Sequence, residues 1–229
     1  MSWVVGKQFI FRDEQRRFFL RTMRKLEAFS GVCVITYCIM SNHFHVLLEV
    51  PDPEKMQELT SDERLELLPI LYSKNSMLYV KQELDRAKDN PKWTREILAR
   101  YEMRRGRLDI FMKELKQRFT QWYNRENGRR GTLWEDRYKS VLVEGNENAL
   151  ITMAAYIDLN PVRAKMVDDP ADYRWSGYGE AMGGGPLARK GLGRLLEEVL
   201  DGELFQSDWR ADGKLVSDGD LRSRRGEGR

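Results

Sequence analysis

The sequence predicts an α+β fold from its length, its apolar content and its order of strand-like and helix-like segments. The 229 residues are enough for one substantial domain with an additional helical part, or for two small domains. Hydrophobic residues make up 41% of the chain, which is enough for a buried core, and charged residues make up 33%, which indicates a heavily ionic surface. No apolar run approaches the ~18 residues of a membrane span, and no secretory signal is evident.

The first fifty residues contain four segments whose patterns predict, in order, a strand, a helix and two further strands. The segments are residues 4–11, 13–28, 32–40 and 43–50. The third is mostly apolar and β-branched, which is typical of a buried strand. Ser41 and Asn42 make a tight connection to the fourth. The last two segments are therefore predicted to form a hairpin.

The middle of the chain is predicted to be helical and strongly charged. Helices are expected over residues 60–89, 92–104 and 109–125. Thr60 and Glu63 have capping-box spacing at the start of the first stretch, and Pro69 is expected to divide it into two helices. The last helix carries an apolar stripe, which predicts core packing rather than a base-stacking platform. The stripe consists of Phe111, Leu115, Phe119 and Trp122.

The last third of the chain predicts one more strand and two more helices. The strand is expected at residues 138–143, a helix at 147–159, and a short helix at 194–200. Pro161 limits the longer helix, because the residue before a proline disfavours helical geometry. From residue 211 onward the sequence is polar and rich in Arg, Gly and Asp, which predicts disorder.

The resulting order of elements is close to the β-α-β-β-α-β plan of a ferredoxin-like antiparallel sheet with helices on one face. Residues 1–180 are predicted to form this domain, and residues 52–108 to be a helical insertion within it. Residues 181–229 are predicted to form a C-terminal extension that is partly disordered.

Charge and cysteine content restrict the partners and the compartment. Residues 91–140 hold 14 Lys and Arg against 7 Asp and Glu, so this block is a candidate phosphate-facing surface, or else a solvated helical face with paired charges. Cys33 and Cys38 are expected to be reduced core residues, since Cys-x4-Cys without further ligands is no zinc signature. Reduced cysteines are typical of the cytoplasm.

The two histidines of the chain, His43 and His45, are candidate metal ligands. They lie two residues apart on one predicted strand, so their imidazoles project from the same face and can converge on one divalent ion. The alternative is a pair of unrelated polar residues at the start of a strand. A hard ion such as Mg²⁺ or Mn²⁺ would take its other ligands from oxygen atoms of protein, water and phosphate.

Tyr156 and Asn160 are four residues apart on a predicted helix, which places them on one face. A tyrosine phenolate can attack phosphorus, and an asparagine carbonyl can bind a metal. The spacing alone favours a more ordinary reading, in which the tyrosine is buried and the asparagine ends the helix. By the same spacing, Asp158 faces away from both and is expected at the surface.

Four ordered blocks of the sequence resemble the single-tyrosine HUH transposases, and the nearest branch is the REP-associated tyrosine transposases. The blocks are residues 37–50 (YCIMSNHFHVLLEV), 131–138 (GTLWEDRY), 156–164 (YIDLNPVRA) and 173–178 (YRWSGY). The first contains the histidine–hydrophobe–histidine strand of this family. Two features differ from the family. Little sequence precedes residue 4, so either part of an edge strand is missing or the start is shortened, and the helical stretch at residues 60–104 is longer than in the compact members.

The resemblance implies a metal-dependent enzyme that nicks and joins single-stranded DNA near hairpins. It places the metal ligands at His43, His45 and Asn160, with Mg²⁺ or Mn²⁺ as the cofactor, and the nucleophile at Tyr156. Attack by the tyrosine would give a 5′-phosphotyrosine link and free a 3′-hydroxyl, which can later rejoin the strands. The resemblance also implies a nucleoid-associated cytoplasmic protein that acts as a monomer or a homodimer.

Basic and aromatic residues near these blocks are candidates for contact with DNA. The basic candidates are Arg129, Arg130, Arg137, Lys139 and Arg163. Any of them could hold a phosphate, although Arg163 could equally cap the helix that precedes it. Trp134 and Trp175 could stack on unpaired bases, but packing in the core is the expectation.

Two other functions fit parts of the sequence. The first is a domesticated protein that binds DNA hairpins without cleaving them. The second is an RNA-binding ferredoxin-like module, which would need exposed aromatic residues on its central strands. The predicted central strands carry mainly histidines and aliphatic residues instead.

Overall fold

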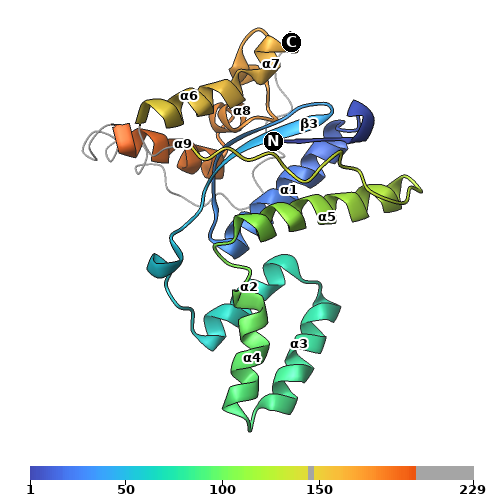
Figure 1. The fold of residues 1–229 in the computed structure, drawn as a ribbon, viewed down its shortest axis with the longest axis vertical. Coiled ribbons are helices and arrows are strands. Elements are labelled where there is room, and N and C mark those ends of the chain that lie inside the picture. The colour runs from blue at the N-terminus through green and yellow to red at the C-terminus, as the bar shows by residue number, and fades with distance from the viewer. Residues whose placement is uncertain (144–146, 200–229) are drawn as a thin grey trace, which may run out of the picture.

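The computed structural model describes residues 1–143 and 147–199, and over these residues the protein is α+β (Figure 1). Its strands are β1 (Ser2–Trp3), β2 (Cys33–Ile39) and β3 (His43–Glu49). Its helices are α1 (Asp13–Ser30), α2 (Ser61–Leu71), α3 (Lys74–Ala87), α4 (Pro91–Glu102), α5 (Leu108–Glu126), α6 (Glu147–Asp158), α7 (Asn160–Arg163), α8 (Gly177–Met182) and α9 (Pro186–Val199). None of the helices in the described ranges is long and apolar enough to cross a membrane.

The sheet has three antiparallel strands in the order β1-β3-β2, so β3 is the central strand. The predicted hairpin of β2 and β3 is confirmed. Residue pairing places Trp3 of β1 directly opposite His43 of β3. The extended segment 133–139 runs along the outer side of β1, where the Glu135 amide donates to the Trp3 carbonyl (3.1 Å). The candidate histidines therefore lie on a strand that is bonded on both sides.

Two of the predicted strands differ from the structure. Residues 4–11 are not a strand, because β1 ends at Trp3 and the chain then turns through Gly6 and Lys7, whose φ angles are positive (61° and 51°). Residues 138–143 contain no strand either, although the Lys139 amide still donates to the Met1 carbonyl (2.9 Å). The edge of the sheet is therefore shorter than the sequence predicts.

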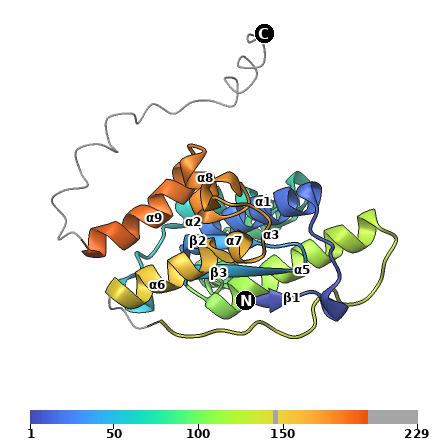
Figure 2. The ribbon, with the colours of Figure 1, turned by 90° about the horizontal axis from the view of Figure 1, so that it is seen from above.

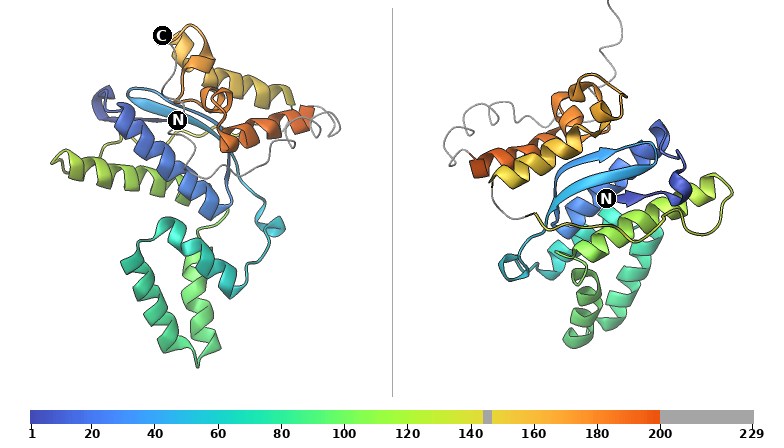
Figure 3. Two further views of the ribbon diagram at one scale, coloured as in Figure 1. Left: turned by 180° about the vertical axis from the view of Figure 1, so that it is seen from behind. Right: turned by 45° about the horizontal axis from the view of Figure 1, so that its top comes forward.

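Helices cover both faces of the sheet, whereas the sequence analysis predicted helices on one face (Figures 2 and 3). Phe44 and His45 are neighbours on β3, so their side chains point to opposite faces. The ring of Phe44 packs on Phe19 of α1, with centroids 4.6 Å apart, while the ring of His45 lies 6.0 Å from Tyr156 of α6. Helices α1 and α5 therefore pack below the sheet, and α6 packs above it.

The predicted core on the α1 and α5 side is confirmed. Phe111, Leu115 and Phe119 of α5 are buried, and Phe119 lies within 5.4 Å of the ring of Phe19. Trp134 and Trp175 are also buried, as expected for packing rather than for stacking on bases. Cys33 and Cys38 are free thiols.

The insertion forms three helices, α2 to α4, with a small hydrophobic cluster of their own. Leu68 and Val80 pack there with Phe29 from the end of α1. The predicted capping box at the start of α2 is confirmed. Pro69 does not divide the helix: it lies inside α2, and the break comes at Tyr72, after which Ser73 caps α3.

The two ends of the insertion lie side by side. The Gly106 amide donates to the Ser30 carbonyl at the end of α1 (2.8 Å). A Cβ atom at Gly106 would lie 3.8 Å from the Pro51 side chain, which leads into the insertion. The chain therefore leaves the sheet domain and re-enters it at nearly the same place.

The sheet domain continues past residue 180, where the C-terminal extension was predicted to begin. Helix α9 packs directly on β2: Leu195 belongs to the main core, and Gly191 faces the backbone of β2. The short helix predicted at residues 194–200 is a longer one, α9, that starts at Pro186. The predicted disordered tail lies outside the described residues.

Replacing Gly191 with alanine should destabilise the protein by about 1–3 kcal/mol, the usual cost of overpacking a core. A Cβ atom there would lie 2.5 Å from the carbonyl oxygen of Ile35, and backbone cannot move aside. Gly193 on the same helix has open space around it, so Gly193→Ala is the matched control and should be neutral or stabilising. Urea unfolding of both variants measures this difference, and equal midpoints would contradict the close packing of α9.

Candidate functional site

The two histidines lie side by side on the α6 face of β3. Their ring centroids are 5.0 Å apart, and the indole of Trp3 stacks on His43 at 3.9 Å. Burial is the main cause that lowers the pKa of each imidazole to about 4. Both rings are therefore neutral at pH 7, which is the form that binds a metal.

Asn42, whose position in the sequence indicates only a turn, orients one of these rings. Its Nδ2 donates to the carbonyl of Lys7 (3.1 Å), and this contact fixes which side of the amide is oxygen. Its Oδ1 must then accept a hydrogen bond from Nδ1 of His43 (2.8 Å). The proton of His43 is thus held on Nδ1, and Nε2 is left with a free lone pair that can bind a metal.

Replacing Asn42 with leucine should weaken Mn²⁺ binding by about 10–100-fold, the usual effect of losing a partner that orients a metal-binding histidine. Asn42→Asp should bind at least as well as wild type, because its carboxylate still accepts from His43 Nδ1. Isothermal titration with Mn²⁺ measures both variants. Equal losses in both would mean that the amide supports the turn and not the imidazole.

Tyr156 comes to the histidines from a distant part of the sequence. Helix α6 lies over the sheet so that the tyrosine ring is 6.0 Å from that of His45, and 47% of its surface remains exposed. The tyrosine is therefore not buried, contrary to the ordinary reading of its spacing. It also lines an apolar groove of about 600 Å³ together with Val141, Leu142, Val143, Asn148, Ala149, Thr152 and Met153. The half-exposed tyrosine therefore lies beside the neutral imidazole of His45, where a polymeric substrate can reach it.

Asn160 and Arg163 follow Tyr156 in α7. The side-chain amide of Asn160 donates to the carbonyls of Tyr156 (3.0 Å) and Ile157 (3.1 Å), which leaves its Oδ1 as a possible ligand. The guanidinium of Arg163 lies 4.0 Å above the ring of Tyr156 and donates to its carbonyl. Arg163 thus caps the end of α6, as one of its two sequence readings predicted, and holds the tyrosine ring from one side.

The donor set fits a divalent ion that takes part of its coordination from outside the protein. Two neutral imidazoles and an amide oxygen leave several positions of an octahedral ion to water or phosphate. Among the residues described, no group of three or more His, Cys, Asp and Glu side chains is placed to hold a metal. A Mg²⁺ or Mn²⁺ ion at this site would take its protein ligands from the predicted set of His43, His45 and Asn160, and no hydrogen bond or ring contact among the described residues joins Asn160 to either ring.

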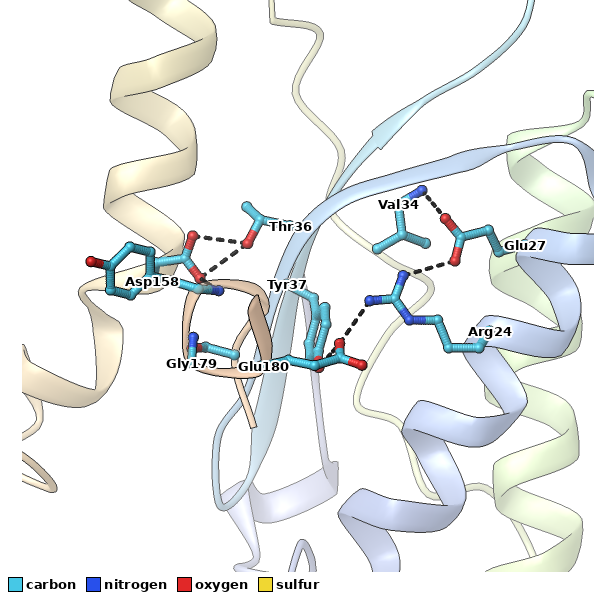
Figure 4. Close-up of polar contacts among 10 residues, drawn as sticks. Arg24, Glu27, Val34, Thr36, Tyr37, Asp158, Gly179 and Glu180 are labelled. Atoms are coloured by element: carbon cyan, nitrogen blue, oxygen red, sulfur yellow. Dashed lines mark hydrogen bonds and ion pairs between the residues drawn. The ribbon is translucent and has the colours of Figure 1, made fainter. Parts of the chain in front are cut away.

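Asp158 is buried, contrary to the expectation that it lies at the surface. It is 6% exposed, and its carboxylate accepts hydrogen bonds from the hydroxyl of Thr36 (2.8 Å) and the amide of Tyr178 (3.0 Å) (Figure 4). Thr36 belongs to β2 and Tyr178 to α8. Asp158 therefore ties the last turn of α6, and with it Tyr156, to the sheet and to α8. A neighbouring network links α1 to α8 through Arg24 and Glu180 (2.8 Å).

Asp158 should make the folding stability fall as the pH rises from about 4 to about 6. Burial raises the pKa of this carboxyl to about 6. Its contribution to folding stability is therefore fully present below the unfolded-state pKa near 3.8, and it is lost as the pH rises through the folded-state pKa. The span corresponds to about 3 kcal/mol. The measurement is the difference in unfolding free energy between wild type and Asp158→Asn, from urea unfolding in EDTA across this pH range. Both proteins contain the histidines, so this difference reports the titration of Asp158 alone. A difference that does not vary with pH would refute the assignment.

The other basic candidates divide into two groups. Arg129 and Arg130 lie in the loop after α5, at the end of that helix remote from α6 (Figures 1 and 2), and no contact brings them to the histidines. Arg137 and Lys139 lie in the extended segment beside β1 and line a polar cavity with Trp3. The structure therefore brings two of these four candidates close to the site.

The chain matches no family model, no curated protein and no solved structure. The likeness to HUH transposases therefore rests on the sequence blocks alone.

Proposed function

We propose that this protein is a metal-dependent transposase that nicks and joins single-stranded DNA near hairpins through a 5′-phosphotyrosine intermediate. The observation that carries the proposal is the meeting of His43, His45 and Tyr156. The histidines come from the central strand and the tyrosine from a helix more than 100 residues later, yet His45 contacts the rings of both His43 and Tyr156. Burial keeps both imidazoles neutral and the tyrosine remains exposed, as metal binding and attack on a polymer require.

The chemistry is a transfer of one phosphodiester bond. The Oη atom of Tyr156 attacks the scissile phosphorus and loses its proton to solvent, the bond from phosphorus to O3′ breaks, and O3′ takes up a proton. A bound Mg²⁺ or Mn²⁺ would polarise a phosphoryl oxygen and stabilise the charge of the transition state. Asn42 holds His43 in the ligating tautomer, and Arg163 and Asp158 hold the tyrosine and its helix. The reverse reaction rejoins the strands, and no ATP is consumed.

The expected fold, partner and location follow from the same proposal. We infer a ferredoxin-like arrangement, in which the segment 133–139 beside β1 supplies the fourth strand position. The partner is single-stranded DNA with hairpins, and the place of action is the nucleoid in the cytoplasm. The free cysteines suit such a compartment.

The test is a denaturing gel of the wild-type protein incubated with end-labelled single-stranded hairpin oligonucleotides and Mg²⁺ or Mn²⁺. A covalent protein–DNA band that EDTA prevents, and that mass spectrometry maps to Tyr156, is the expected result. DNA binding without any covalent band, across both metals and a panel of hairpins, would instead favour a protein that binds hairpins without cleaving them.

A further inference from the structure

A polar cavity lies beside Trp3, whose indole stacks on His43. Its volume is about 320 Å³, and its lining includes Trp3, Lys7, Glu135, Asp136, Arg137 and Lys139. The order of the rings sets its position: Trp3 stacks on His43, His43 contacts His45, and His45 contacts Tyr156. Trp3 with the cavity and Tyr156 are therefore the two ends of one chain of ring contacts that runs through both histidines.

We propose that this cavity binds the DNA strand that ends in the 3′-hydroxyl and holds it between cleavage and rejoining. This inference rests on the proposed function. In a phosphoryl transfer the attacking and leaving oxygens lie roughly in line on opposite sides of phosphorus. With phosphorus over the histidine pair and Tyr156 at one end, O3′ points to the other end. The nucleotide that carries O3′ is thereby directed to Trp3 and the cavity.

The lining of the cavity suits the last nucleotide of a single strand. Lys7, Arg137 and Lys139 supply three cations for its phosphates, and the side chains of all three are exposed. Glu135 and Asp136 supply acceptors for the amino group of a base. The volume lies at the lower end of the range for small-molecule pockets, which suits one nucleotide.

The backbone at Lys7 provides a second and independent indication. Lys7 has a φ of 51°, a left-handed conformation that is uncommon for residues other than glycine and that concentrates at binding sites. Its carbonyl accepts from Nδ2 of Asn42, the residue that orients His43. Its ammonium lies 5.5 Å from the ring of Trp3. The amide that orients His43 therefore also holds the backbone of Lys7, whose ammonium lies over the tryptophan that stacks on His43.

The first experiment measures binding and needs no cleavage. In a Tyr156→Phe background, the affinity for fluorescein-labelled (dT)12 is measured by anisotropy over a range of NaCl concentrations. Lys7→Ala and Arg137→Ala should each lower the slope of log K against log salt by about 0.7, the value for one phosphate contact on a single strand. Lys25→Ala is the matched control, because Lys25 is exposed on α1, which packs on the opposite face of the sheet. Unchanged slopes in both cavity variants would overturn the proposal.

The second experiment follows wild-type cleavage and rejoining of a hairpin oligonucleotide that gives the covalent band. In the Lys7→Ala/Arg137→Ala variant the strand that ends in the 3′-hydroxyl should dissociate from the protein after cleavage. We expect rejoining to fall at least tenfold and the covalent adduct to accumulate, with a much smaller change in the rate of first cleavage. Equal losses in cleavage and rejoining would overturn the assignment to the 3′-hydroxyl strand. Absence of any covalent band in wild type would reject the proposed function, while the salt slopes would still decide whether the cavity binds single-stranded DNA.

Discussion

Replacing Tyr156 with phenylalanine should abolish the covalent attachment of DNA and leave DNA binding within about twofold of wild type. Phenylalanine has no oxygen that can attack phosphorus, whereas its ring can keep the contacts with His45 and with the guanidinium of Arg163. Because 47% of the Tyr156 surface is exposed, removing the hydroxyl leaves no buried polar partner unsatisfied. The substitution should therefore remove the covalent attachment of DNA without lowering the folding stability of the protein.

A matched control separates the nucleophile from a general effect of tyrosine loss. Tyr79 in α3 is 72% exposed and belongs to the insertion, so Tyr79→Phe should nick and join DNA at the wild-type rate. Both variants are compared with wild type on the same hairpin panel by denaturing gel. A covalent band that survives in Tyr156→Phe would identify another nucleophile and remove the central role of α6.

Replacing His45 with alanine should weaken Mn²⁺ binding by at least about 100-fold, more than the loss of an orienting partner costs, and nicking should fall with it. His45 is 8% exposed and lies between His43 and Tyr156, so no other described imidazole can take its place. Isothermal titration with Mn²⁺ and the nicking assay measure both effects, and high Mn²⁺ should restore part of the activity. Unchanged Mn²⁺ affinity would mean that the pair of histidines does not form the metal site.

The pH dependence of metal binding adds a check on the same site. A histidine with an ordinary pKa near 6.5 is about 90% protonated at pH 5.5, and its metal affinity would fall about tenfold relative to pH 7.5. Burial lowers the pKa of both His43 and His45 to about 4, so protons compete little at pH 5.5. The Mn²⁺ affinity of wild type should therefore change by less than about threefold between these two pH values.

The parts of the fold that the sequence predicts best are those in which apolar periodicity is long. The hairpin of β2 and β3, helix α1 and helix α5 lie where the pattern places them. The strand expected at residues 138–143 fails because the pattern does not say whether a partner exists: Val141 and Leu142 are 79% and 92% exposed. The strand expected at residues 4–11 fails because the turn at Gly6 and Lys7 depends on tertiary contacts with Asn42.

Only those residues of the candidate site whose type and spacing indicate a chemical role could be predicted from the sequence. His43 and His45 are the only histidines and share a strand face, and spacing places Tyr156 and Asn160 on one helix face. Asp158 could not be found in this way, because residue type does not distinguish a buried aspartate from one exposed to solvent. The signal that was missed is its place beside Ala154 and Ile157, which are one turn or less away and buried.

Pro51 and Gly106 are adjacent, so the insertion between them could be removed without separating the two ends that it joins. A turn of a few residues could close the gap between them without altering the order or pairing of any strand. Such a shortened chain would uncover Phe29, which packs with Leu68 and Val80, so a polar replacement at that position would have to accompany the deletion. The histidine pair and Tyr156 all lie outside the deleted stretch, so α2 to α4 are open to shortening, exchange or grafting while the reacting groups stay where they are.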